Sequence, residues 1–130
     1  MNRATDRQKL GQLGEKAARE LLRKRGYRIR ETGFRCRHGE IDIIAQRQDC
    51  LVFVEVRTKC SPAFGTPEES LTQAKKRRIV ASALTYTTAH QDLPSLWRID
   101  VVAIELDDRG KTTRIEHIEN AIEQDHPFTF

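Results

Sequence analysis

Apolar residues recur at three- and four-residue spacing along residues 6–25, and this period predicts an amphipathic helix. Asp6 is a candidate N-cap for this helix, and Gly26 is a candidate C-terminal stop. A second helix is expected to begin after Thr72, another candidate N-cap, and to run to about His90. We therefore expect one helix at the start of the chain and another in its second half.

Between and after these helices, apolar and polar residues alternate, which is the period of a strand. Three strands are expected between the helices, at residues 27–35, 39–46 and 51–57, and their short connections favour antiparallel hairpins. Two more are expected at residues 97–104 and 113–118. This order predicts a single domain over the whole chain, an α/β sandwich around a mixed sheet of roughly five strands.

Carboxylates stand inside the two most apolar strands, Glu40 and Asp42 in one and Glu55 in the next. An ionised carboxylate is costly to bury unless something compensates its charge. Strand alternation removes part of this difficulty, because it divides the first of these strands into two sides. One side carries Ile41, Ile43 and Ala45, and the other carries Glu40, Asp42 and Ile44.

Asp42 and Glu55 are expected to lie opposite each other. A hairpin closed at the polar turn between the two strands pairs position 42 with about position 55. Alternation also places Glu55, Arg57 and Lys59 on one face of the later strand. Two carboxylates and at least one cation would then converge on one face of the sheet.

Such a pair of acids suits a divalent cation. Neighbouring carboxylates repel each other, apolar surroundings disfavour ionisation further, and a bound cation removes both penalties. Oxygen ligands favour Mg²⁺ or Mn²⁺ over zinc, and such an ion can activate water against a phosphodiester. The alternative is that Asp42 and Glu55 form salt bridges with Arg57 and other arginines, and the spacing fits both interpretations equally well.

Positive charge is concentrated in short runs of the chain. The 130 residues carry 23 Lys and Arg against 19 Asp and Glu, a formal net charge of +4, with basic runs at residues 23–30, 35–38 and 75–78. Each run alone fits a solvated surface. Four cations in the first turns of the second helix oppose its macrodipole, however, and an anionic partner would offset that cost. We therefore expect nucleic acid as a partner. The candidate contacts are Arg35, Arg37, Lys75 and Lys76.

No apolar run approaches the ~20 residues that cross a bilayer, and the charged N-terminal residues lack the apolar stretch of a signal peptide. A cytoplasmic protein without a membrane partner is therefore expected. Cys36, Cys50 and Cys60 are odd in number and have no CxxC spacing, which argues against a zinc site or a disulfide framework.

Several segments together resemble the YraN-type family of bacterial proteins. They are "GEKAARELLRKRGY" from Gly14, "GEIDII" from Gly39, "LVFVEVRTK" from Leu51, "WRIDVVAI" from Trp97 and "IENA" from Ile118. This family is similar to archaeal Holliday-junction resolvases and so to the restriction-endonuclease-like fold. The resemblance implies an α/β/α sandwich around a mixed sheet, with an Asp…Glu-x-Lys metal site.

The resemblance assigns roles to four residues. Asp42 matches the metal-binding aspartate of the motif, and Glu55 matches its second metal-ligating acid. The carbonyl of Val56 is implied as a further metal ligand, and Glu15 matches the accessory acid of resolvase-like proteins. The implied cofactor is Mg²⁺ or Mn²⁺. Glu40 has no role in the motif and is expected to be an exposed acid at the end of its strand.

The sequence departs from the motif at its last position, where Arg57 replaces the lysine. An arginine binds phosphate bidentately but does not deprotonate, so Arg57 cannot be a general base. Lys59, on the same strand face, is an alternative source of the ammonium group.

The resemblance therefore implies a metal-dependent endonuclease acting on DNA, including branched DNA, and a homodimer, because resolvases cut symmetrically. Arg57 leaves two alternatives open. One is a catalytically inactive nucleic-acid-binding module, and the other is an interaction subunit of a DNA-processing complex.

Overall fold

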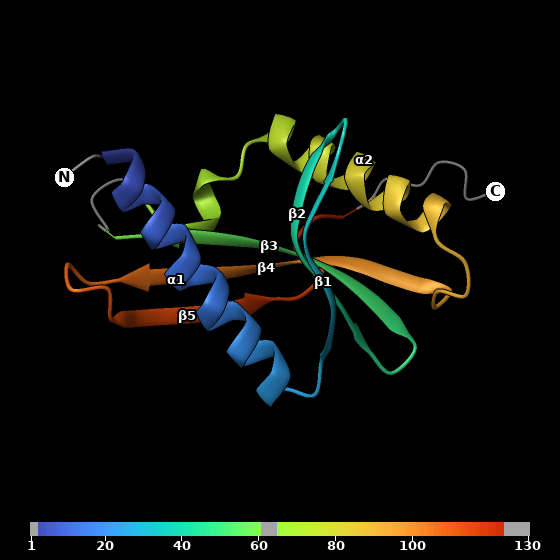
Figure 1. The fold of residues 1–130 in the computed structure, drawn as a ribbon, viewed down its shortest axis with the longest axis horizontal. Coiled ribbons are helices and arrows are strands. Elements are labelled where there is room, and N and C mark those ends of the chain that lie inside the picture. The colour runs from blue at the N-terminus through green and yellow to red at the C-terminus, as the bar shows by residue number, and fades with distance from the viewer. Residues whose placement is uncertain (1–2, 61–64, 124–130) are drawn as a thin grey trace.

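Two helices and five strands follow one another in the predicted order (Figure 1). The computed structural model describes residues 3–60 and 65–123. Its elements are α1 (Arg3–Lys24), β1 (Arg28–Cys36), β2 (Gly39–Arg47), β3 (Cys50–Lys59), the 3₁₀ turn η2 (Glu68–Ser70), α2 (Gln73–Ala89), β4 (Leu96–Leu106) and β5 (Thr112–Ile118). Neither helix in these described ranges is long and apolar enough to span a membrane.

The strands form one mixed sheet in the order β1-β2-β3-β4-β5. β3 and β4 are parallel, while the other neighbouring pairs are antiparallel. A parallel pair needs a long crossover, and the segment containing α2 supplies it between β3 and β4. The predicted α/β fold with a five-stranded mixed sheet is confirmed, and it is consistent with a restriction-endonuclease-like arrangement.

Each face of the sheet is covered by one helix (Figure 1). On one face, Ala18 and Leu22 of α1 pack with Val52 and Val54 of β3. On the other face, α2 packs on a second cluster centred on the fully buried Phe53. Successive residues of β3 thus serve opposite cores, which explains why its apolar run is continuous rather than alternating.

The helix ends follow the predicted capping residues with one exception. Thr72 accepts a hydrogen bond from the Lys75 amide at 3.2 Å, as an N-cap should. Gly26 has a φ of +88°, the left-handed conformation that commonly ends a helix. The prediction for Asp6 was wrong, because α1 already begins at Arg3 and Asp6 lies within it.

The predicted facing of β2 fails at Ile41. Ile43 and Ala45 do share the α1 side, but Ile41 packs into the cluster on the α2 side together with Ile44. The pairing of β2 with β3 ends at Ile43, opposite Val54, while β2 remains paired with β1 as far as Gly39. A strand that leaves one of its partners is free to twist, so strict alternation stops there.

α1 crosses β3 at very short range, at Gly14. A Cβ added to Gly14 would overlap Oγ1 of Thr58 and would lie 3.0 Å from its Cβ and 3.1 Å from its Cγ2. No rotation of the threonine side chain relieves all three contacts. Gly14 therefore lets α1 approach the sheet, and Glu15, the next residue, is brought to the same place.

We expect Gly14→Ala to destabilise the fold by about 1–3 kcal/mol, because the added methyl group forces α1 away from β3. Urea unfolding at neutral pH measures this free energy. Gly11→Ala is the matched control: a Cβ there meets nothing within 4 Å among the described residues. Gly11→Ala should raise the free energy of unfolding by up to about 1 kcal/mol, because alanine has a better helix propensity than glycine.

The Thr58→Ala substitution should rescue Gly14→Ala, since it removes two of the three atoms that the new methyl group meets. A double-mutant cycle should give a coupling free energy of about 0.5–3 kcal/mol. If Gly14→Ala lowered the free energy of unfolding equally with and without Thr58→Ala, the close approach of α1 to β3 at Gly14 would be contradicted.

Candidate active site

Asp42 and Glu55 meet where β2 separates from β3. Asp42 is the residue just beyond the last paired position of β2, and its Oδ2 accepts a hydrogen bond from the Val56 amide at 2.8 Å. The carboxyl group of Asp42 thereby bonds a backbone amide of the adjacent strand. The register of the paired residues, Ile43 with Val54 and Ile44 with Phe53, is the one that sets position 42 against position 55.

The two carboxyl groups perturb each other. Burial, followed by the charge of Glu55, raises the pKa of Asp42 to about 8, although the Val56 amide acts in the opposite direction. Burial also raises the pKa of Glu55, against the effects of a hydrogen bond with Asp42 and of the Arg57 charge. At neutral pH the pair therefore holds a proton that two ordinary carboxylates would have lost.

The donor set suits a hard divalent cation. The pKa values of both carboxyl groups are raised by burial, and the charges of Arg57 and Lys75 offset this only in part. No group of three or more His, Cys, Asp or Glu residues that could hold a metal occurs in the described part of the chain. Mg²⁺ keeps several waters and is often bound through one or two carboxylates, so the residues present fit such an ion.

Glu15 of α1 lies close to this pair. Burial raises the pKa of Glu15 first, and the charges of Asp42 and Glu40 raise it further, while Arg19 acts against them. The repulsion shows that Glu15 and Asp42 lie within electrostatic reach of each other. The structure therefore brings Glu15 to the acid pair but does not make it a member of a three-acid cluster.

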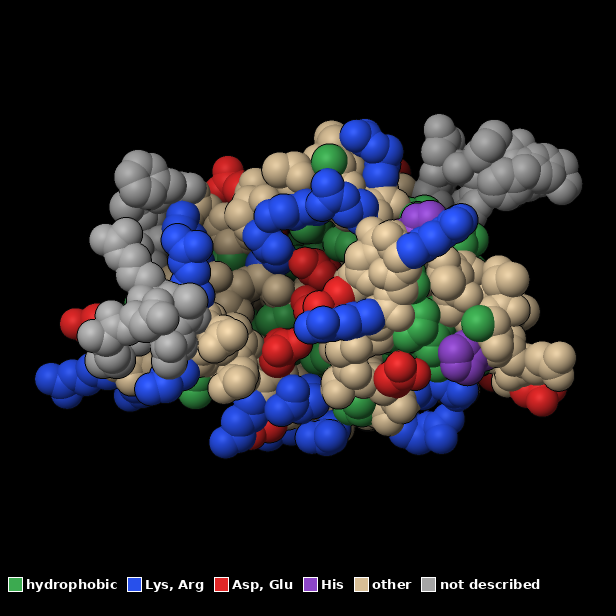
Figure 2. Space-filling model, turned by 45° about the horizontal axis from the view of Figure 1, so that its top comes forward, with side chains coloured by type: hydrophobic (Ala, Val, Ile, Leu, Met, Phe, Trp, Pro, Cys, Tyr) green, Lys and Arg blue, Asp and Glu red, His purple; other side chains and the backbone are tan. Residues whose placement is uncertain are grey.

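An open groove of about 910 Å³ leads to the acids. It lies between α1 and the sheet, and both Asp42 and Arg57 line it. Figure 2 shows acidic side chains gathered in a hollow with lysine and arginine side chains around it. Residues that the sequence did not single out also line the groove, namely Arg7, Gln8 and Gln12 of α1. In the sequence, these three residues fall on the polar side of the first helix. That pattern could have indicated them, but it is the same for a groove wall and for an ordinary solvated face.

Arg57 is held between Glu55 and Ser70. Its Nη1 lies 3.3 Å from Glu55 Oε2, and its Nε and Nη2 donate to Ser70 Oγ at 3.0 and 2.8 Å. Glu55 and Arg57 are mostly buried, with 13% and 23% of their side chains exposed. The guanidinium is therefore fixed beside the acid pair by the 3₁₀ turn η2.

Lys59 does not approach the acids in this structure. Its Nζ donates to the Gly65 carbonyl at 2.6 Å, so its ammonium group is directed to the loop that follows β3. Of the two candidate cations on this strand, the structure places Arg57, and not Lys59, at Glu55.

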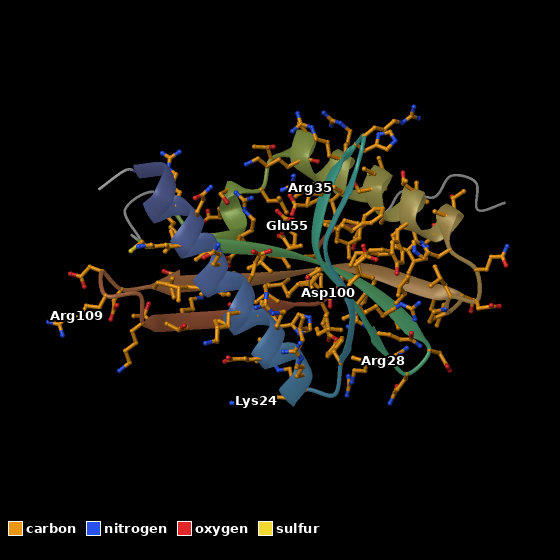
Figure 3. The ribbon with its side chains drawn as sticks, viewed as in Figure 1. Lys24, Arg28, Arg35, Glu55, Asp100 and Arg109 are labelled. Carbon is orange, nitrogen blue, oxygen red and sulfur yellow. The ribbon has the colours of Figure 1, made fainter. Side chains whose placement is uncertain are left out.

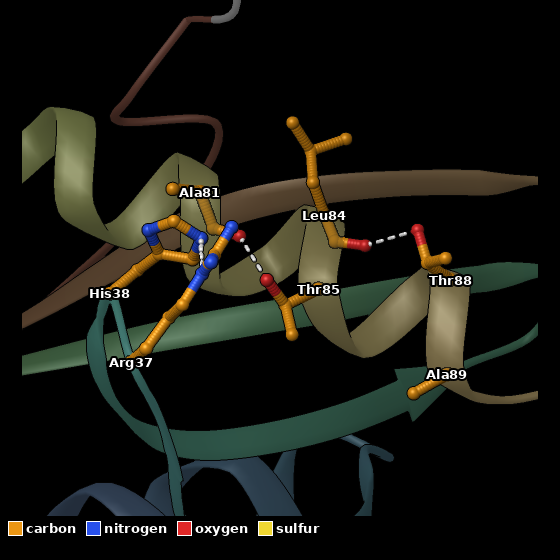
Figure 4. Close-up of a pocket in the computed structure, with 7 residues that line it drawn as sticks. All are labelled: Arg37, His38, Ala81, Leu84, Thr85, Thr88 and Ala89. Atoms are coloured by element: carbon orange, nitrogen blue, oxygen red, sulfur yellow. Dashed lines mark hydrogen bonds between the residues drawn. The ribbon is translucent and has the colours of Figure 1, made fainter.

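The four candidate nucleic-acid contacts fall into different places. Lys75 acts on Glu55 as a positive charge, and Lys76 follows it in the first turn of α2. Arg35 lines the groove and lies 3.6 Å from Glu40, an exposed acid as predicted. Arg37 instead lines a separate hollow beside α2, together with His38 (Figure 4).

Asp100 stands apart from this site. Figure 3 shows Glu55 and Asp100 toward the middle of the sheet, on the neighbouring strands β3 and β4. Asp100 is fully buried and pairs with Arg98, whose Nε lies 2.9 Å from Oδ1. It also contacts His117 of β5, with Nε2 and Oδ2 2.7 Å apart.

Comparison with known proteins gives a family for the chain. It is 47% identical over 120 residues to a UPF0102 protein of Roseiflexus castenholzii, covering 91% of this chain and 96% of that protein. A UPF0102 protein of Myxococcus xanthus is 38% identical over 118 residues, with 91% and 92% covered. One of Trichlorobacter lovleyi is 44% identical over 117 residues, with 89% and 91% covered. These matches confirm the predicted resemblance to the YraN-type family. With residues 14–104 matching its family profile, this chain belongs to the uncharacterised protein family UPF0102.

Proposed function

We propose that the protein is a nucleic-acid-binding protein whose acid pair is a metal-dependent endonuclease-like site for phosphodiesters in DNA, including branched DNA. The observation that carries this proposal is the contact between Asp42 and Glu55 beside an open groove, with Arg57 fixed against them. Buried acids that meet and have raised pKa values beside a groove are more typical of functional sites than of a structural core.

Asp42 and Glu55 would hold Mg²⁺ or Mn²⁺, and the bound ion would supply an activated water and a charge opposite the phosphate. Arg57 would neutralise charge on the phosphate, since its guanidinium is a permanent cation. Glu15 faces the same groove and would orient water from the side of α1. Arg35 and Lys75 would contact neighbouring phosphates, which positions the nucleic acid without reading its sequence.

A second candidate is a nucleic-acid-binding module without catalysis. Two observations favour it: the donors of Arg57 are already engaged by Glu55 and Ser70, and Lys59 is bonded to Gly65. Among the described residues, no lysine donates a hydrogen bond to Glu55, and Lys75 acts on it only through its charge. This candidate predicts salt-dependent binding of nucleic acid without cleavage.

The deciding experiment incubates purified protein with linear, flapped and four-way DNA in Mg²⁺, in Mn²⁺ and in EDTA. We expect cleavage that requires the metal and that falls by about 100-fold or more in Glu55→Gln, because that variant removes a carboxylate from the metal site. Glu20→Gln is the matched control, an exposed acid on α1 whose loss should leave the rate unchanged.

Equal cleavage by wild type and Glu55→Gln would refute the assignment of the acid pair. Binding without cleavage in every metal would instead select the binding module. Sedimentation of the same protein, alone and with DNA, measures the homodimer that the resolvase resemblance implies.

A further inference from the structure

A second polar hollow, of about 300 Å³, lies at the opposite end of α1. Its lining residues are Arg25, Tyr27, Arg47, His117 and Glu119. Arg25 follows α1, ten positions after Glu15, which corresponds to ~15 Å along a helix. None of the five lining residues also lines the groove at the acid pair.

The walls of this hollow are held in place by ring contacts. The ring of Tyr27 meets that of His117 edge to face, with centroids 5.6 Å apart. The guanidinium of Arg47 lies over the Tyr27 ring, 5.6 Å from its centroid. Such contacts fix side chains that would otherwise sample many rotamers, so less entropy is lost when a ligand binds.

His117 is oriented from behind by a buried acid. Its Nε2 lies 2.7 Å from Oδ2 of the fully buried Asp100, and only 2% of the His117 side chain is exposed. His117 nonetheless lines the hollow, so one edge of the oriented ring belongs to its wall.

The hollow has more unpaired positive charge than unpaired negative charge among the described residues. Among the described residues, Arg25 and Arg47 form no ion pair, whereas the carboxylate of Glu119 is already paired with Arg98 at 2.9 Å. The hydroxyl of Tyr27 accepts from Arg98 at 2.6 Å and donates to Glu119 only at 3.4 Å. Two guanidiniums without an ion pair among the described residues, a hydroxyl that donates only a weak hydrogen bond and an oriented imidazole therefore line one small space.

We propose that this hollow binds a phosphate group. Arginine donors arranged in a fork match phosphate oxygens in geometry and charge, and the hydroxyl of Tyr27 adds a further hydrogen-bond donor. The ligand is either free phosphate or the phosphate of a nucleotide, since both present the same oxygens. The site goes beyond the proposed nuclease function, because it requires neither a metal nor the acid pair.

The test follows the ring signals of His117 and Tyr27 by NMR in EDTA, during titration with inorganic phosphate, thymidine 5′-monophosphate or thymidine. Saturable shifts are expected with both phosphates and none with thymidine. Tighter binding of the monophosphate than of inorganic phosphate would assign the site to a nucleotide, and equal binding would assign it to the free anion. Because EDTA is present, failure of the nuclease proposal leaves this result unaffected.

Three variants separate a built site from general attraction to a basic surface. Arg47→Gln should weaken phosphate binding by about tenfold, because it removes a charge-assisted donor. Glu119→Gln should tighten it, because it removes the carboxylate from the wall. Arg23→Gln, an exposed arginine of α1 outside the hollow, is the matched control and should change nothing. Equal weakening in Arg23→Gln and Arg47→Gln, or saturable binding of thymidine alone, would overturn the proposal.

Discussion

At pH 8 and without divalent cations, the Asp42→Asn variant is expected to be more stable than the wild type. The asparagine oxygen can still accept the Val56 amide, while the repulsion between Asp42 and Glu55 disappears. The same substitution removes a charged oxygen ligand, so binding of Mn²⁺ should be lost. One substitution thus separates the stability cost of the buried acid pair from the metal binding that we propose for it.

The pH dependence has a definite sign. The pKa of Asp42 is raised from 3.8 to about 8 in the fold, so between these values the folded protein holds a proton that the unfolded chain has lost. Stability is therefore greatest at the acidic end of this window and falls as the pH rises through about 8. Between pH 5 and pH 8 we expect the wild type to lose on the order of 2 kcal/mol of stability, and Asp42→Asn to lose less, because only Glu55 keeps a raised pKa there.

Chemical denaturation at pH 5 and pH 8, with and without Mn²⁺, measures these differences. The ion should stabilise the wild type more at pH 8, since metal binding displaces the shared proton. Glu40→Gln is the control: this exposed strand-end acid should leave the metal response intact. A wild type that is equally stable at both pH values and insensitive to Mn²⁺ would contradict the metal site.

Local patterns carried the sequence prediction of the acid pair. Arg47 pairs with Cys50 across a two-residue turn, so the hairpin register follows from the turn length alone. Counting back from that turn brings Asp42 to Glu55, and strand alternation puts Arg57 on the same face as Glu55. Each step needs only neighbouring residues, which is why it can be made without a structure.

Features that depend on distant segments could not be predicted in the same way. Thr58 meets Gly14 only because α1 folds back across β3, and no periodicity links these positions. The alternation rule failed at Ile41 because it assumes a strand paired on both sides. The hollow at Tyr27 likewise joins residues that are far apart in the chain, since Tyr27 and Glu119 are 92 positions apart.

Removing the buried acid of β4, by Asp100→Ala, is expected to destabilise the protein by about 3–5 kcal/mol, because it leaves its partners uncompensated inside the fold. Asp100 has no exposed surface, and it accepts from Arg98 at 2.9 Å and from the Asn120 amide at 2.9 Å in addition to its contact with His117. It therefore ties β4 to β5 and to the turn that follows. Urea unfolding at pH 7 measures the loss.

The difference in unfolding free energy between wild type and Asp100→Ala should become smaller at acidic pH. Burial alone would raise the pKa of Asp100, but hydrogen bonds from His117 and Arg98 outweigh it, and the pKa is lowered. A depressed carboxyl pKa contributes stability above its unfolded value, and that contribution disappears as the pH falls through the folded pKa. The gap between wild type and Asp100→Ala should be complete at pH 7 and should narrow below about pH 4.

Glu119→Ala is the matched control, since Glu119 pairs with the same arginine but has 58% of its side chain exposed. An exposed ion pair contributes at most about 1 kcal/mol, so its loss should be small at every pH. Similar effects of the two substitutions would show that Asp100 acts as an ordinary surface charge and that burial adds nothing. A large effect of Asp100→Ala alone would mean that the buried acid holds β5 in place, and with it the imidazole of His117 at the proposed phosphate site.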